Sequence, residues 1–239
     1  MSNNLAMELR LGTRQAHTDA ENVGFMKCFL KGVVVKDAFA KFLSNLYFVY
    51  SELETAIQQH QQHPVIKLIY FPELNRQSYL AKDMAFYYGE TWPQQIIPSP
   101  AAQTYIARIR QLSEHEPALL LGHSYTRYMG DLSGGQMLQK VAQSALKLSG
   151  YEGTSFYNFE QITDKKAFKD KYRQALDAVP TDEIMVKKIV AEANYAFKLN
   201  MQIVQELEAS LILALGAETY QQLTVSKNPG STEVRAVHS

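Results

Sequence analysis

The chain has 239 residues, 46% of them hydrophobic, which is enough to bury a substantial core in one large domain or two small ones. Its 24 basic residues balance 24 acidic ones, so no global field favours nucleic acid or an anionic membrane. The single cysteine, Cys28, excludes an internal disulfide, a cysteine-rich zinc site, a thiolate-held iron–sulfur cluster and a prosthetic group attached at C-x-x-C-H. One lone thiol fits a reducing, cytosol-like compartment.

The N-terminal stretch is charged from residue 8 onward, which is wrong for a secretory signal. The longest apolar runs, "PALLLG" at 117–122 and "SLILALGA" at 210–217, are much shorter than the roughly 20 residues of a membrane-spanning helix. We therefore expect a soluble, cytoplasmic protein without a membrane anchor.

Helical periodicity dominates the chain. Apolar residues recur at three- and four-residue spacings in 5–20, 36–58, 77–89, 100–113, 118–148 and 182–215, and 164–176 adds another helix. Ser99-Pro100 resembles a helix start, Pro117 opens the long helix, and Gly150 and Gly216 are expected stops. Since no segment alternates as a strand, the sequence predicts one all-α, multi-helix bundle over 1–226 and a disordered tail over 227–239.

The stretch "GDLSGG", 130–135, places three glycines inside the 118–148 helix. Each interior glycine costs roughly 1 kcal/mol relative to alanine, so a compensating role is expected. The spacing fits neither the dinucleotide fingerprint nor the phosphate loop, which excludes nucleotide binding. Two interpretations remain: a G-x-x-x-G contact with a close helix, or a flat ligand lying against the backbone of a kinked helix beside Asp131.

His17 lies at the edge of the apolar stripe of the first predicted helix, four residues before Glu21. A histidine at such a rim is commonly structural. A neutral imidazole that binds a metal gains, however, from a carboxylate that accepts its other N–H, and Glu21 is placed to do so. No second histidine or cysteine completes a zinc site with His17, so a single axial ligand to haem iron is the better metal interpretation.

Four stretches together carry a resemblance to a known family: "LGTRQAHTDAENVGFMKCFLKG" (11–32), "YTRYMGDLSGGQMLQKVAQSAL" (125–146), "FKDKYRQALDAVP" (168–180) and "EANYAFKLNMQIVQELE" (192–208). With them, the chain resembles haem oxygenase from end to end. In that family, haem is held between a proximal helix with the iron-binding histidine and a kinked, glycine-rich distal helix. The His17 and G-D-L-S-G-G segments are the most specific part of the match.

The resemblance implies a role for particular residues. The iron ligand would be His17, and the distal glycines would be Gly130, Gly134 and Gly135. Asp131 would order a water network, with Tyr50, Arg127 and Asn200 near it. The groups around the haem propionates would be Arg10, Lys169, Arg173 and Tyr125, and Phe197 would be a pocket aromatic. Without the family, Lys169 and Arg173 would be read as part of a solvated face.

The resemblance also implies the reaction. Haem b would be both substrate and cofactor, and oxygen with external electrons would convert it to biliverdin, ferrous iron and carbon monoxide, with cleavage at the α position. A neutral histidine ligand and a water-mediated proton supply favour attack on the porphyrin edge over peroxidase-type O–O cleavage. The expected electron donor is reduced ferredoxin or another reductase, and biliverdin would feed bilin-pigment enzymes, as in oxygen-evolving phototrophs.

Two other functions stay open from the sequence. A non-catalytic haem-binding protein could share His17 and the basic residues without needing Asp131 and its glycines. A thiaminase-like enzyme on the same scaffold would need a poised nucleophile, but the only thiol, Cys28, lies in apolar "FMKCFLKG". If His17 does not bind iron, His123 is the alternative ligand.

Overall fold

The computed structural model describes residues 4–227 and 230. It contains the α-helices α1 (Leu5–Gly12), α2 (Arg14–Glu21), α3 (Gly24–Leu30), α4 (Lys36–Gln59), α5 (Ile66–Ile69), α6 (Gln77–Tyr88), α7 (Trp92–Gln95), α8 (Pro100–His115), α9 (Leu120–Ser124), α10 (Gly130–Leu146), α11 (Lys165–Asp177), α12 (Glu183–Glu206), α13 (Glu208–Leu215) and α14 (Ala217–Thr224). Shorter turns are 3₁₀-helical η1 (Pro72–Leu74), η2 (Pro117–Leu119) and η4 (Ser155–Tyr157), and π-helical η3 (Tyr125–Met129). These residues include no strand, so the predicted all-α fold is confirmed.

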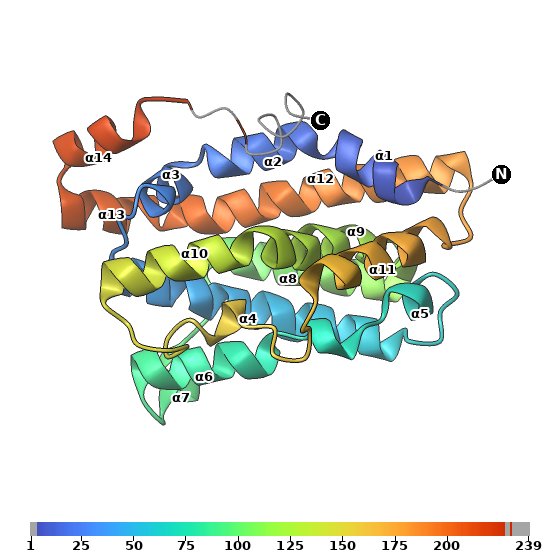
Figure 1. Cartoon of the computed structure of the whole chain (residues 1–239), viewed down its shortest axis with the longest axis horizontal. Helices are drawn as coiled ribbons and strands as arrows, with labels where there is room; N and C mark the ends of the chain where they lie inside the picture. The colour runs from blue at the N-terminus through green and yellow to red at the C-terminus, as the bar shows by residue number, and fades with distance from the viewer. Residues whose placement is uncertain (1–3, 228–229, 231–239) are drawn as a thin grey trace.

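Two 24-residue helices, α4 and α12, organise the bundle. α12 packs against α1 and α2 on one side and against α8 and α9 on the other, whereas α4 packs against α6 and α8 (Figure 1). Both helices bury apolar residues at helical spacing, including Leu46 and Leu53 on α4 and Leu199 and Ile203 on α12, all fully buried. α12 thus lies between the pair α1 and α2 and the pair α8 and α9.

The helix predictions at 36–58, 77–89 and 100–113 are confirmed to within two residues. The predicted N-cap is also confirmed, because the Ser99 hydroxyl accepts from the Ala102 N–H at 3.3 Å. The predicted single helix at 5–20 is wrong: the chain breaks at Thr13, whose hydroxyl donates to the Leu9 carbonyl at 2.7 Å. Likewise, 182–215 is two helices that meet at Leu207.

Two predicted helix stops have different outcomes. Gly216 ends α13 with a φ of +83°, as glycine permits. Gly150 is not the stop of α10, because that helix ends at Leu146 and Lys147 itself adopts the left-handed conformation at φ +55°. The stop is three residues earlier than the glycine predicts.

The last two helices, α13 and α14, pack against α3. The Glu208 carboxylate accepts from the Gly24 N–H, the first of α3, at 3.0 Å. In return, Lys27 of α3 and Lys31, the residue after it ends, donate to the carbonyls of Thr224 and Leu223, at 2.7 and 2.6 Å. Each contact places a charge at the helix end that it complements, which ties the end of the described bundle to its beginning.

The predicted tail falls mostly outside the described residues. Lys227 is exposed, and Gly230 is buried against the side chain of Thr18. In the described part of the chain, no helix is both long and apolar enough to cross a membrane.

Candidate functional site

His17 lies on α2, the short helix that follows the break at Thr13. Its Nδ1 atom is buried and has no hydrogen-bond partner in the described chain, although 32% of the side chain is exposed. The exposed part of the ring is therefore the side away from Nδ1. The Glu21 carboxylate, one turn along α2, lies 3.8 Å from Nδ1, too long for a hydrogen bond but within reach of a small side-chain rotation.

The ring of Phe197 on α12 holds the imidazole of His17 in place. The two rings meet edge to face, with centroids 5.8 Å apart. His17 thus presents one open ring nitrogen, from a helix whose orientation is fixed by contact with α12.

A hydrogen-bonded network joins Asp131 to three residues on other elements. Tyr50 of α4 is fully buried and donates to the Asp131 carboxylate on α10. Arg127 of η3 donates from Nε to the Tyr50 hydroxyl at 3.0 Å and from Nη1 to the Asn200 amide oxygen on α12. The four residues that the sequence analysis grouped are therefore in contact.

The charges of this network act on one another. The pKa of Asp131 is raised above its ordinary value because burial is the largest effect. The Arg127 charge, the Tyr50 hydrogen bond and the Arg76 charge lower it and offset part of that rise. Burial also holds the pKa of Tyr50 well above its ordinary value, so Tyr50 keeps its proton and can donate it in the bond to Asp131. Asp131 therefore combines a partly desolvated carboxylate with a rigid hydrogen-bond partner.

The helix changes pitch immediately before the glycines. η3 is a turn of π-helix over Tyr125–Met129, and α10 begins at Gly130. A π turn is a known cause of helix kinks and is common at functional sites. The π turn therefore places a break at the point where the resemblance implies a kink.

The three glycines do not share one environment. A Cβ built on Gly130 or Gly134 would meet no heavy atom of another described segment within 4 Å, whereas one on Gly135 would lie 3.2 Å from the Tyr157 ring. The first two glycines therefore face open space, which removes the close helix contact as their explanation. Gly122 does allow such a contact, since a Cβ there would lie 2.9 Å from the Ala193 backbone nitrogen of α12.

The predicted propionate-binding residues come from α1, η3 and α11, and α1 packs against α11. Burial raises the pKa of Tyr125, while a hydrogen bond with Thr13 and the charges of Arg173 and Arg10 lower it. The Tyr125 hydroxyl therefore lies within electrostatic reach of both arginines. Arg173 is exposed and paired with Asp170 at 2.5 Å. Lys169, one turn earlier on α11, is half-buried.

His123 is unsuited to be an alternative iron ligand. It is fully buried, with Nε2 2.9 Å from a Glu192 carboxylate oxygen and Nδ1 3.3 Å from the Tyr105 hydroxyl. Burial lowers the pKa of His123, so the neutral ring donates from Nε2 to Glu192, and Arg108 holds the same carboxylate at 2.6 Å. Both ring nitrogens are already engaged.

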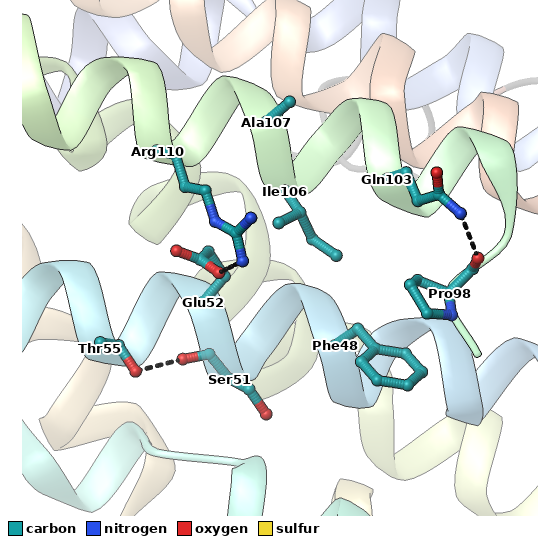
Figure 2. Close-up of a pocket in the computed structure, with 9 residues that line it drawn as sticks. All are labelled: Phe48, Ser51, Glu52, Thr55, Pro98, Gln103, Ile106, Ala107 and Arg110. Carbon is teal, nitrogen blue, oxygen red and sulfur yellow. Dashed lines mark hydrogen bonds and ion pairs between the residues drawn. The ribbon is translucent and has the colours of Figure 1, made fainter. Parts of the chain in front are cut away.

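A surface cavity of about 420 Å³ lies apart from all of these residues, between α4 and α8 (Figure 2). Its charged groups, Arg110 and Glu52, are paired with each other at 2.7 Å. The two charged groups of the cavity therefore neutralise each other, and its floor is apolar. Among the described residues, no set of reactive groups lines it.

Comparison with known proteins decides the family. The family model for heme oxygenase matches residues 3–206. Heme oxygenase 1 of Nostoc sp. is 52% identical over 234 residues, which cover 98% of each chain. The chain belongs to the haem oxygenase family. The solved structure of heme oxygenase-2 from Synechocystis sp. in complex with heme and NO matches with a TM-score of 0.95, at 48% identity over 96% of each chain. The solved structure of heme oxygenase-1 from Synechocystis sp. in complex with heme matches with a TM-score of 0.88, at 52% identity over 92% of this chain and 100% of that one.

For a haem oxygenase, the residues present fit the ligand that the family requires. The open nitrogen of His17 suits an axial iron ligand, and the unpartnered Nδ1 suits an N–H held by Glu21. Gly130 and Gly134 leave a backbone surface without side chains, which a flat macrocycle can approach closely. Tyr157 and Arg76 could not be predicted from the sequence, because their positions near α10 depend on contacts between distant segments, and the break at Thr13 leaves no sequence signal.

Proposed function

We propose that this chain uses molecular oxygen and electrons to cleave haem b, which is both substrate and cofactor, into biliverdin, ferrous iron and carbon monoxide. The observation that carries the proposal is the family match over nearly the whole chain, at 52% identity to heme oxygenase 1 of Nostoc sp.. Bound haem supplies the iron at which oxygen is activated. The protein supplies binding, orientation and proton control.

On the proximal side, His17 would bind the iron through its open ring nitrogen. Glu21 would accept the Nδ1–H, which fixes the tautomer of the neutral imidazole. The edge of Phe197 restricts rotation of the ring. A neutral nitrogen ligand donates less electron density than a thiolate, so it does not favour O–O cleavage in the way that a thiolate ligand does.

On the distal side, Asp131 would order the water that delivers a proton. Tyr50 occupies Oδ2 of the carboxylate, which leaves Oδ1 for water. Arg127 holds the Tyr50 hydroxyl and is itself held by Asn200, so the carboxylate is positioned by a chain of three residues. A proton supplied through water at a fixed position is what the reaction at the porphyrin edge requires.

Arg10, Lys169 and Arg173, with the Tyr125 hydroxyl, would bind the propionates of haem. Cations at one edge of a rigid macrocycle determine its rotation in the site, and so the meso carbon that faces the oxygen. These residues would therefore govern the cleavage position, α by resemblance, more than the rate.

The two rival functions are less well supported. Cys28 is fully buried and burial raises the pKa of its thiol, so it is a poor nucleophile for a thiaminase-like reaction. A haem carrier would have no use for a buried tyrosine and arginine that position a carboxylate beside two open glycines.

We further propose reduced ferredoxin as the electron donor, cytoplasmic location, and consumption of biliverdin by bilin-forming enzymes. The family relatives from Nostoc sp. and Synechocystis sp. support a phototroph-like setting.

The test is haem titration followed by aerobic turnover with ferredoxin and its reductase. We expect one haem to bind per chain with a Soret band of nitrogen-ligated iron, which then decays as biliverdin absorbance and carbon monoxide appear. A Soret band that survives these conditions without bilin would leave only haem binding.

A further inference from the structure

Tyr157 in η4 carries a polar group that the proposed mechanism does not use. Only 2% of the residue is exposed, and its hydroxyl has no hydrogen-bond partner within residues 4–227 and 230. Buried polar groups in folded proteins are nearly always bonded to protein or to ordered water, because leaving one unsatisfied is costly. A phenylalanine would fill the same space without this cost, so the hydroxyl needs an explanation.

The ring of Tyr157 is held tightly between two neighbours. It packs against Gly135 on α10, where an added Cβ would lie 3.2 Å from its Cδ1 atom, and against the Phe156 ring with centroids 4.8 Å apart. Phe156 in turn meets Tyr50 edge to face at 5.4 Å. Tyr157 is therefore fixed beside the distal helix at its third glycine, in the layer of rings that also supports Tyr50.

The titratable groups whose electrostatics act on the Tyr157 hydroxyl indicate that it lies near the distal network. They come from three elements: Asp131 on α10, Asp83 and Tyr87 on α6, and Arg127 on η3. Burial, with the Asp131 and Asp83 carboxylates, raises the pKa of Tyr157 well above its ordinary value. The hydroxyl therefore keeps its proton and is a hydrogen-bond donor.

Few of the neighbouring groups are available to accept a hydrogen bond from the Tyr157 hydroxyl. Both Asp83 oxygens are already engaged, by the Ser155 and Phe156 N–H groups at 2.7 and 2.8 Å, and the Tyr87 hydroxyl donates to the Gly153 carbonyl at 3.0 Å. Asp131, by contrast, uses Oδ2 for Tyr50 and has no described partner on Oδ1. Asp131 therefore has fewer hydrogen-bond partners than Asp83, and its Oδ1 atom can accept a further hydrogen bond.

We propose that Tyr157 is a positioning residue of the distal site, and that its hydroxyl donates to a buried water that also bonds Asp131. Asp131 would then be held from two sides, by Tyr50 directly and by Tyr157 through water. Gly135 allows this close contact, because a Cβ there would lie 3.2 Å from the Tyr157 ring and the ring would have to shift slightly. The catalytic consequence rests on the proposed function, whereas the buried water does not.

The test compares Tyr157→Phe with Tyr172→Phe in the full chain. Tyr172 is a matched control, since it is fully buried but its hydroxyl bonds Ser124 at 2.9 Å. In haem-free crystals of the wild type, we expect an ordered water within about 3.2 Å of the Tyr157 hydroxyl and of Asp131. Urea unfolding of haem-free Tyr157→Phe should show no gain in stability, because the water loses a donor.

The second measurement is biliverdin formation by the enzyme with bound haem. Without the donor, the carboxylate form of Asp131 loses support, so the acidic limb of the pH profile for biliverdin formation should move up by about 0.4 to 1 pH unit in Tyr157→Phe. The rate at neutral pH should fall about two- to tenfold with unchanged haem affinity. Tyr172→Phe should leave the pH profile in place.

Three results would overturn the inference: no ordered water at the hydroxyl, a Tyr157→Phe protein more stable than the wild type, or an unmoved pH profile. If wild-type protein forms no biliverdin, the proposed function fails, and the water and the urea measurements still decide whether Tyr157 supports Asp131.

Discussion

Replacing Gly134 by alanine should raise the stability of the haem-free protein and weaken its binding of haem. Gly134 lies inside α10, and a Cβ there would meet no described segment within 4 Å. The haem-free protein should therefore gain the helix-propensity difference, about 0.8–1.0 kcal/mol. For a chain of this length, that gain raises the melting temperature by about 2–4 °C. The same methyl group would project from the surface that we assign to haem, where overpacking costs about 1–3 kcal/mol.

The assay pairs thermal unfolding of haem-free protein with haem titration. We expect Gly134→Ala to melt higher and to bind haem about five- to a hundredfold more weakly, or to give an altered set of biliverdin isomers. Gly122→Ala is the control, because its Cβ would lie 2.9 Å from the α12 backbone, and it should destabilise the haem-free protein. A Gly134→Ala protein with wild-type haem affinity and product would refute the argument, and so would one that unfolds more easily.

Three further outcomes are expected. His17→Ala should lose the spectrum of nitrogen-ligated haem while His123→Ala keeps it; an unchanged spectrum in His17→Ala would remove that residue as ligand. Asp131→Ala should retain haem but form little biliverdin, measured as product absorbance per haem consumed, and a wild-type yield would exclude Asp131 from proton delivery. Burial is the largest single effect on Glu192 and raises its pKa, but the hydrogen bonds and charges of His123 and Arg108 together outweigh it and lower the pKa to about 2. This depressed pKa stabilises the fold above pH 4.5, an effect lost as the pH falls toward 2, so Glu192→Gln should unfold more easily at pH 7 and show a flatter acid titration of helicity than wild type.

The fold class and one cluster of the candidate site could be predicted from the sequence. The grouping of Tyr50, Arg127, Asp131 and Asn200 came from the family resemblance, and the structure brings all four into contact. Periodicity alone reached the all-α fold, since the long helices carry wide apolar stripes. The roles of His17 and of the basic residues at the haem edge remain predictions.

What escaped prediction leaves little signal in the local sequence pattern. The break at Thr13 lies in an unbroken helical pattern, because a threonine that bonds the carbonyl four residues earlier leaves no sequence signal. α3 is seven residues long, and Lys27 is its only charged residue, so it has little periodicity to detect. The different roles of Gly134 and Gly135 follow from what faces each one, and for Gly135 that is Tyr157, more than 20 residues away in the sequence.

One helix connects the two sides of the proposed haem site. Phe197 and Asn200 lie three residues apart on α12, and they contact His17 and Arg127, respectively. The same helix is bound to α9 by the buried bond between Glu192 and His123 and by the close approach at Gly122. Because α12 is a single rigid element, the proximal ring and the distal arginine cannot shift along it independently. The spacing between the two sides is thus set by the packing of α12, which is why a change at Gly122, remote from the iron ligand, should lower the stability of the whole bundle.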